Sequence, residues 1–226
     1  RLLDDILDLS RIESGKVEFE SLPFAPCPAL REVATLLGSR AAAKQLALNL
    51  RLPKDESLTV LGDAVRLKQV LFNLAGNALK FTERGSVDLE MTVVREDATR
   101  VALRFVVRDT GIGMSRATQR RLFQTFTQGD SSTTRRFGGS GLGLAISQQL
   151  VRQMGGDIHV KSEEQQGSEF SFEVTYPKGQ AGGAPAPGGT PTGTLQGRVL
   201  VAEDDATNKR VIQLMLKRLG LDSRVV

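Results

Sequence analysis

Residues 63–81 read DAVRLKQVLFNLAGNALKF, and their spacing decides how the rest of the sequence is interpreted. At about 100° per residue, a helix over these positions carries two stripes of side chains. The apolar stripe consists of Leu67, Val70, Leu71, Leu74 and Ala78, and the polar stripe consists of Arg66, Gln69, Asn73, Asn77 and Lys80. A solvated helix face usually mixes acids and bases, whereas this polar stripe holds amides and cations without a carboxylate.

The polar stripe has the chemistry of a site for phosphate and a divalent cation. Asn77 offers Mg²⁺ one hard oxygen, while phosphates and water would supply the other ligands, as is usual for this ion. Lys80 follows about one turn later, where its ammonium group can meet phosphate oxygens. The same residues also fit an ordinary amphipathic helix, so this stretch alone leaves both interpretations open.

The segments around this helix predict an α+β fold. Helical spacing of apolar residues occurs over residues 2–12, 29–44 and 142–154, and strand-like patterns occur over 17–19, 46–52, 87–94, 101–108, 158–160 and 170–174. A polar, glycine-rich stretch covers residues 110–141. This order predicts helices on one face of a mostly antiparallel sheet.

Asp109 is expected to point into the apolar layer of this fold. Side chains alternate along a strand, and Asp109 has the same parity as the apolar residues Phe105 and Val107. A buried carboxylate is costly unless a donor meets it, and the amino group of adenine is a suitable donor. The alternative is that Asp109 caps the turn through Gly111 and Gly113, since Asp before Gly is common in turns.

A second glycine-rich segment, GGSGLG at residues 138–143, leads directly into a predicted helix. Free backbone N–H groups and the helix dipole attract phosphate at such a point. No Lys-Ser or Lys-Thr pair follows the glycines, which excludes a Walker P-loop, and the spacing does not fit the Rossmann fingerprint. Alone the segment is weak evidence, because many glycine-rich turns are plain loops.

In their order and spacing, these motifs resemble the ATP-binding domain of sensor histidine kinases over about residues 1–177. Residues 73–77 with Lys80 match the N box, 109–114 the first glycine box, 123–126 the F box and 139–143 the second glycine box; Gly167-Ser-x-Phe170 matches as well. The resemblance implies a two-layer α/β sandwich of the Bergerat type that binds ATP and Mg²⁺. It covers most of the chain, and its motifs are specific in combination.

The resemblance assigns a role to each matching residue. Asn77 would hold Mg²⁺, Lys80 a phosphate group and Asp109 the adenine amine. The residues that it implies in ATP binding are Asn73, Asn77, Lys80, Asp109, Gly111, Gly113, Phe123, Phe126, Arg136, Gly139, Ser140, Gly141, Leu142 and Gly143.

Residues 114–138 would then form a mobile lid over ATP. Docking of Phe123 and Phe126 on the core could close it, since each buried large apolar side chain is worth roughly 1.5–3 kcal/mol. Arg135 and Arg136 would lie near the γ-phosphate. The alternatives are a small helix packed on the core and a solvated pair of charges.

The sequence contains one histidine, His159. Kinases of this family phosphorylate a histidine on the first helix of a dimeric two-helix hairpin, and residues 1–15 resemble only the end of the second hairpin helix. His159 lies between glycines and an apolar run, so it is expected on a strand surface with a structural role. The chain is therefore predicted to bind ATP and Mg²⁺ without phosphorylating itself.

Four segments are expected along the chain: the end of the dimerisation hairpin at residues 1–15, the catalytic domain at 16–177, a Gly/Pro-rich linker at 178–196 and a truncated receiver domain at 197–226. Residues 199–205 resemble the first strand of a doubly wound α/β receiver, and the helical spacing of Val211, Leu214, Met215 and Leu219 predicts its first helix. In such a receiver Glu203 and Asp204 would bind Mg²⁺. Together these parts resemble a hybrid histidine kinase. Such a protein forms a homodimer through its hairpin helices and passes phosphate to an aspartate of a receiver or response regulator, here beyond Val226.

Composition excludes other classes. The 30 Lys and Arg residues against 26 Asp and Glu give a net charge of +4, which is too balanced for a nucleic-acid binder. The single cysteine, Cys27, can form neither an internal disulfide nor a zinc knuckle and suits a reducing compartment. This region is expected in the cytoplasm, with any membrane anchor of the intact protein in segments upstream of Arg1.

Three other functions compete with this interpretation. An Hsp90-like or MutL-like ATPase would carry a glutamate base four residues before the Mg²⁺-binding asparagine, where this chain has Asn73. A serine kinase of the anti-sigma type would lack the leading hairpin helix and the trailing receiver. A non-catalytic ATP-binding scaffold of the same superfamily stays open, because no phosphoacceptor histidine lies within the chain.

Overall fold

A computed structural model describes residues 19–124, 141–179, 197–201, 209, 213, 216 and 220–225. The chain divides into two compact units, Arg1–Ala184 and Pro185–Val226. Several predicted features lie outside the described residues: the helix at 2–12, the linker from residue 180 onward, and Phe126, Arg135, Arg136, Gly139, Ser140, Glu203 and Asp204.

The first unit is built on a five-stranded sheet. Its strands lie in the order β2 (Ala47–Arg51), β4 (Ser86–Glu96), β5 (Arg100–Asp109), β7 (Gly167–Pro177) and β6 (Ile158–Glu163). β2 and β4 are parallel, and every other neighbouring pair is antiparallel. The prediction of a mostly antiparallel sheet is confirmed.

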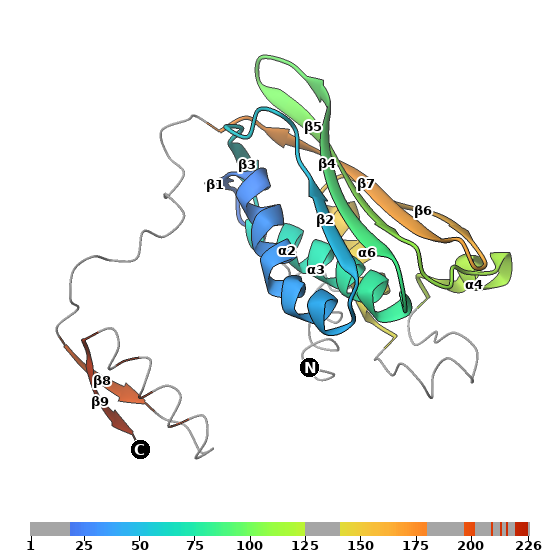
Figure 1. The fold of residues 1–226 in the computed structure, drawn as a ribbon. Helices are drawn as coiled ribbons and strands as arrows, with labels where there is room; N and C mark the ends of the chain where they lie inside the picture. The colour runs from blue at the N-terminus through green and yellow to red at the C-terminus, as the bar shows by residue number, and fades with distance from the viewer. Residues whose placement is uncertain are drawn as a thin grey trace. The chain divides into compact units, whose positions relative to one another are not determined.

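Three helices cover one face of this sheet, as predicted (Figure 1). They are α2 (Pro26–Ala43), α3 (Ala64–Phe81) and α6 (Gly143–Gln153), and a short helix, α4 (Arg116–Arg121), follows β5. A separate two-stranded sheet pairs β1 (Leu22–Phe24) with β3 (Val60–Gly62). Within the described residues, none of the helices combines the length and apolarity needed to cross a membrane.

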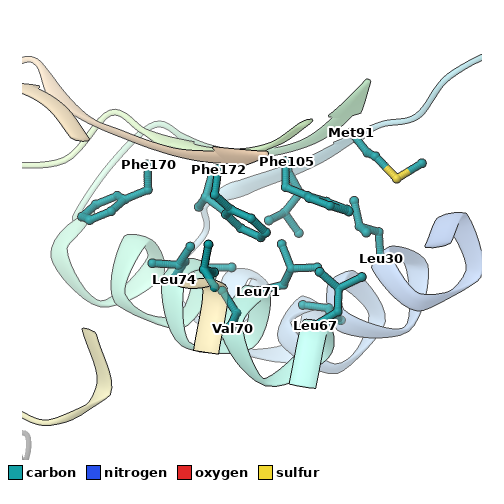
Figure 2. Packing of buried hydrophobic residues seen from close by; sticks show 14 of the residues in the cluster. Leu30, Leu67, Val70, Leu71, Leu74, Met91, Phe105, Phe170 and Phe172 are labelled. Carbon is teal, nitrogen blue, oxygen red and sulfur yellow. The ribbon is translucent and has the colours of Figure 1, made fainter. Parts of the chain in front are cut away.

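The core forms where the apolar stripe of α3 meets the inner side chains of the sheet (Figure 2). Leu67, Val70, Leu71, Leu74 and Ala78, which make up this stripe, are all buried. Above them, Phe105 of β5 stacks on Phe172 of β7 with ring centroids 5.0 Å apart. The two-stripe interpretation of α3 is thus confirmed on its apolar side.

Helix α2 adds a buried cysteine to this core. Cys27 is 0% exposed in the first turn of the helix, and burial raises the pKa of its thiol to about 11. The sequence placed the start of this helix at Ala29, three residues too late. Pro26 occupies the first turn, where proline is tolerated because the N–H groups there have no helical partner.

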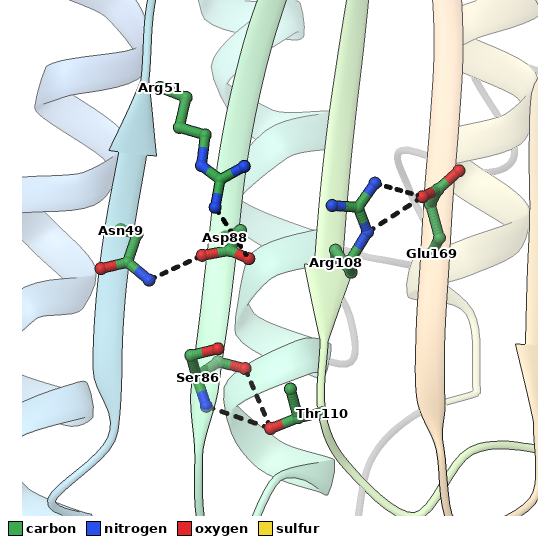
Figure 3. Close-up of polar contacts among 7 residues, drawn as sticks. All are labelled: Asn49, Arg51, Ser86, Asp88, Arg108, Thr110 and Glu169. Carbon is green, nitrogen blue, oxygen red and sulfur yellow. Dashed lines mark hydrogen bonds and ion pairs between the residues drawn. The ribbon is translucent and has the colours of Figure 1, made fainter.

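The outer face of the sheet is polar and crossed by contacts between strands (Figure 3). Arg108 of β5 pairs with Glu169 of β7 at 2.6 Å, and Asn49 of β2 donates to Asp88 of β4 at 2.7 Å. His159 is exposed on β6, opposite Ser171 of β7 in the register. Because the neighbouring Ile158 is buried, His159 faces away from the helices.

Some elements differ from the sequence prediction. A strand was expected at residues 17–19, of which only Phe19 is described, and it lies in no strand; the strand is β1, at Leu22–Phe24. β3 was not expected, because its three residues are too few to produce a readable periodicity.

The second unit contains two strands among its described residues. β8 (Arg198–Val201) agrees with the predicted strand, and it pairs in parallel with the unexpected β9 (Asp222–Val225). Parallel neighbours require a crossover connection of a dozen or more residues, and about 20 residues separate these two strands.

Candidate functional site

The polar stripe of α3 lines a groove. All five of its residues are half-buried, and Gln69, Asn73, Asn77 and Lys80 border a space of about 940 Å³ between α2, α3 and α6. Gly143, at the start of α6, lies on the same groove. The structure therefore brings the N-box residues and the end of the second glycine box together.

Asn73 connects the two helices on either side of this groove. Its Nδ2 donates to Oγ of Ser147 at 2.8 Å, and Ser147 is 2% exposed. A Cβ at Gly143 would lie 2.5 Å from Oδ1 of Asn73, so a larger residue there would displace the amide that donates to Ser147. The start of α6 is thereby fixed against α3.

Asn77 and Lys80 occupy the last two turns of α3. Partial burial lowers the pKa of the Lys80 ammonium, and its Nζ lies 4.8 Å from the centre of the Phe81 ring. No group of three or more His, Cys, Asp or Glu side chains in the described part of the chain could hold a metal ion. The Asn77 amide offers one hard oxygen, which could serve as a single ligand to an ion that takes its other oxygens from phosphate and water.

Asp109 is buried at the end of β5, as its strand parity predicted, with 6% of its surface exposed. Burial raises the pKa of its carboxyl, while backbone N–H groups of Gly111 and Ser168 oppose the shift. The Gly111 N–H donates to Oδ1 at 2.8 Å. The turn-capping interpretation is thus also correct, because the same carboxylate both caps the turn and lies in the apolar layer.

The first glycine box lies between the end of α3 and the β6–β7 turn. The Ile112 N–H donates to the carbonyl of Phe81 at 3.3 Å, and the Ile112 carbonyl accepts from Gln165 at 2.7 Å. Gly113 has a φ of +63°, and a Cβ there would collide with the carbonyl of Glu163. Asp109 does not border the groove, but its loop is hydrogen-bonded directly to the helix that does.

Helix α4 starts the predicted lid. Ser115 caps it by accepting from the Thr118 N–H, and the side-chain amide of Gln119 donates to the carbonyls of Met114 and Ser162, each at 2.9 Å. The partly buried Phe123, just beyond the helix, packs against the core. The interpretation of this stretch as a small helix packed on the core therefore holds for its described part.

The second glycine box is described from Gly141 onward. Gly141 has a φ of +70°, which suits the turn into α6. Leu142 is 0% exposed, and its side chain belongs to the core. The sequence assigned Leu142 to ATP binding, but its buried side chain leaves only the backbone for that role.

Three residues near the site were not recognised in the sequence. Ser147 holds Asn73, the Ser168 N–H faces the Asp109 carboxylate, and Lys44 binds the end of α3. Ser168 lies in the Gly167-Ser-x-Phe170 motif, for which the resemblance implies no particular role. No local pattern marks the other two, because each acts on a segment more than 30 residues away.

Comparison with known proteins identifies the family. Residues 62–178 match the family described as histidine kinase-, DNA gyrase B-, and HSP90-like ATPase, and this match covers more than half of the chain. This chain belongs to that ATPase family. The matched region of this ATPase domain runs from β3 to the end of β7 and includes all the site residues named above except Lys44.

Relatives of this ATPase domain are sensor histidine kinases. GacS of Pseudomonas protegens is 40% identical over 221 residues, 98% of this chain and 24% of that protein. BarA of Escherichia coli K12 is 45% identical over 173 residues, 76% of this chain and 19% of that protein. The chain thus spans about a quarter or less of these relatives. The solved structure of full-length ShkA in complex with AMPPNP is 32% identical, with a TM-score of 0.67, and covers 100% of this chain and 44% of that one.

Proposed function

We propose that this chain is the ATP-binding catalytic core of a hybrid sensor histidine kinase in two-component signalling. The observation that carries the proposal is the meeting of three motifs at α3: its polar stripe, the loop after the buried Asp109 and the start of α6. Family membership and the named relatives support it.

Each motif then contributes one part of nucleotide binding. The unshared lone pairs of the Asp109 carboxylate accept the adenine amine, and Asn77 offers its amide oxygen to Mg²⁺. Lys80 and backbone N–H groups at the start of α6 bind phosphate. When bound, Mg²⁺ would neutralise charge on the phosphates; the protein's part is to orient the nucleotide.

In the intact protein we propose that the γ-phosphoryl group moves from ATP to a histidine of the hairpin helix. The bond between phosphorus and the ADP oxygen breaks, and a phosphorus–nitrogen bond forms. Onward transfer would reach an aspartate of a receiver domain, where Glu203 and Asp204 would hold Mg²⁺. Dimerisation would occur through the hairpin helices, and residues 178–196 would link the catalytic domain to the receiver.

The side chain at position 73 argues against hydrolysis by the Hsp90-like route. That route needs a carboxylate base, and Asn73 is an amide whose Nδ2 is already bound to Ser147. An amide cannot take a proton from water at neutral pH. The site therefore favours binding and positioning of ATP over activation of water.

ATP affinity tests the proposal. Asp109→Asn should weaken binding of a fluorescent ATP analogue at least tenfold (about 1.4 kcal/mol), because an amide replaces one acceptor of the adenine amine with a donor. His159→Ala, on the outer face, should leave the affinity unchanged. Equal effects of the two substitutions would mean that the pocket is misplaced. The parent chain should acquire no acid-labile phosphate from radiolabelled ATP.

A further inference from the structure

Lys44 makes three side-chain hydrogen bonds to the end of α3. It follows α2 directly, and its Nζ donates to the carbonyls of Leu79 at 2.7 Å, Lys80 at 2.9 Å and Thr82 at 3.1 Å. These carbonyls lie more than 30 residues away in the sequence. One side chain thus joins the α2–β2 connection to the helix of the N box.

The contact completes the hydrogen bonding of the last turn. The final carbonyls of an α-helix have no partner within the helix. The Ala78 carbonyl accepts from the N–H and hydroxyl of Thr82, and the Phe81 carbonyl accepts from Ile112 of the first glycine box. Lys44 supplies partners for the other three carbonyls from residue 78 to residue 82.

The number of donors on the Lys44 ammonium group limits which other groups it can bind. An ammonium group has three N–H donors, and here all three are taken by carbonyls, two in the last turn of α3 and one of its C-cap residue Thr82. Lys44 borders the groove, yet in this arrangement it has no donor left for phosphate. Its charge also lies at the negative end of the α3 dipole, where a cation is stabilising.

We infer that Lys44 is a positioning residue for nucleotide binding: it fixes the last turns of α3 and thereby aims Lys80 and Asn77 at the phosphates and Mg²⁺. The inference rests on the proposed ATP site. Without Lys44, the carbonyls of Leu79, Lys80 and Thr82 would hydrogen-bond to water, and the last turn of α3 would fray. Because one of these carbonyls belongs to Lys80, the direction of the Lys80 side chain would loosen with it.

A double-mutant cycle in the 226-residue chain tests the inference. ATP affinity is measured without Mg²⁺, so that effects through Asn77 are left out, for the parent, Lys44→Met, Lys80→Met and the double variant. Lys44→Met should weaken ATP binding about tenfold in the parent and less than about twofold in the Lys80→Met background, since coupled residues are not additive. Additive losses would overturn the inference, because general loosening of the fold acts equally in both backgrounds.

Two further variants separate positioning from other effects. Lys44→Arg keeps the charge and several donors, so it should recover at least half of the lost binding free energy. Lys178→Met removes a lysine that pairs with Glu96 at 2.7 Å outside the groove, and it should leave ATP affinity unchanged. Unchanged affinity in Lys44→Met, with Lys80→Met and Asp109→Asn weakened, overturns this inference alone. Unchanged affinity in Lys80→Met and Asp109→Asn overturns the proposed function instead.

Discussion

At the scale of single residues, Asp109 combines two demands that oppose each other. Its carboxylate is buried and accepts from the Gly111 N–H, which fixes the turn into the first glycine box. Burial of the charge disfavours ionisation, and the pKa is raised accordingly. A buried, ionised carboxylate lowers the stability of the fold but provides a negatively charged acceptor at a fixed place. Such residues are often found at functional sites.

Stability should therefore depend on pH through Asp109. The folded chain holds this proton more tightly than the unfolded chain, so the associated stabilisation is complete below the ordinary pKa of 3.8 and is lost as the pH rises through the raised value. Asp109→Asn has no such proton. Relative to the parent chain, its free energy of unfolding in urea titrations should rise as the pH increases from about 4 through the raised pKa of Asp109. A constant difference between the two proteins over this range would contradict the prediction.

Gly113 is expected to tolerate no side chain. Its positive φ and the nearby carbonyl of Glu163 make Gly113→Ala destabilising by more than about 1 kcal/mol in urea unfolding. Gly38, inside α2, is a matched control because a Cβ there meets nothing within 4 Å. Gly38→Ala should stabilise the chain by about 0.4–1 kcal/mol. The same sign for both substitutions would refute the argument.

At the scale of elements, α3 organises the site because partners from elsewhere in the chain hold both of its ends. At its start, Asp63 accepts from the Arg66 N–H at 2.9 Å and, through its other oxygen, from the Glu20 N–H at 3.3 Å. At its end, Lys44 and Ile112 bind the last carbonyls. The helix is thereby fixed lengthwise, and its polar stripe keeps one position along the groove.

Removal of the N-terminal cap should cost stability. Asp63→Ala is expected to lower the free energy of unfolding by about 1–2 kcal/mol, because two backbone N–H groups lose their acceptor. Val65→Ala, at a position in the first turn that is 62% exposed, should change it by less than about 0.5 kcal/mol. Chemical denaturation of both variants at one pH provides the comparison.

The sequence was most informative where side-chain periodicity and burial coincide. The apolar stripe of α3, the long strands β4 and β5 and the inward direction of Asp109 followed from spacing alone. The pairs Lys44 with the end of α3 and Asn73 with Ser147 did not, since periodicity describes one element at a time and these contacts join two. β1, β3 and β9 have only three or four residues and are defined by pairing with distant segments, so local pattern could not reveal them.

At the scale of the whole molecule, the chain combines two units of unequal size. The first contains the complete five-stranded sheet, its three covering helices and every described residue of the candidate site. The second contains the parallel pair of β8 and β9. A parallel pair of strands joined by about 20 residues is what the proposed beginning of a receiver would contain.

The first unit should bind ATP without the second. A chain ending at Gly179 keeps all of β7 and is expected to have the same ATP affinity as the parent, within about twofold, since no described site residue is removed. It should also keep the parent's main unfolding transition. Calorimetry and nucleotide titration of the two chains provide the test, and a loss of affinity of about tenfold would show that the second unit takes part in binding.

The single cysteine allows unfolding of the region around α2 to be measured without introducing any new residue. Alkylation of a thiol requires both access and ionisation, and Cys27 in the folded chain lacks access and has a pKa of about 11. At neutral pH, the rate at which a maleimide reagent modifies this sulfur therefore reports how often local or global unfolding exposes the first turn of α2. Mass spectrometry can follow the rate of Cys27 modification with and without nucleotide, and so report how nucleotide changes local unfolding around α2.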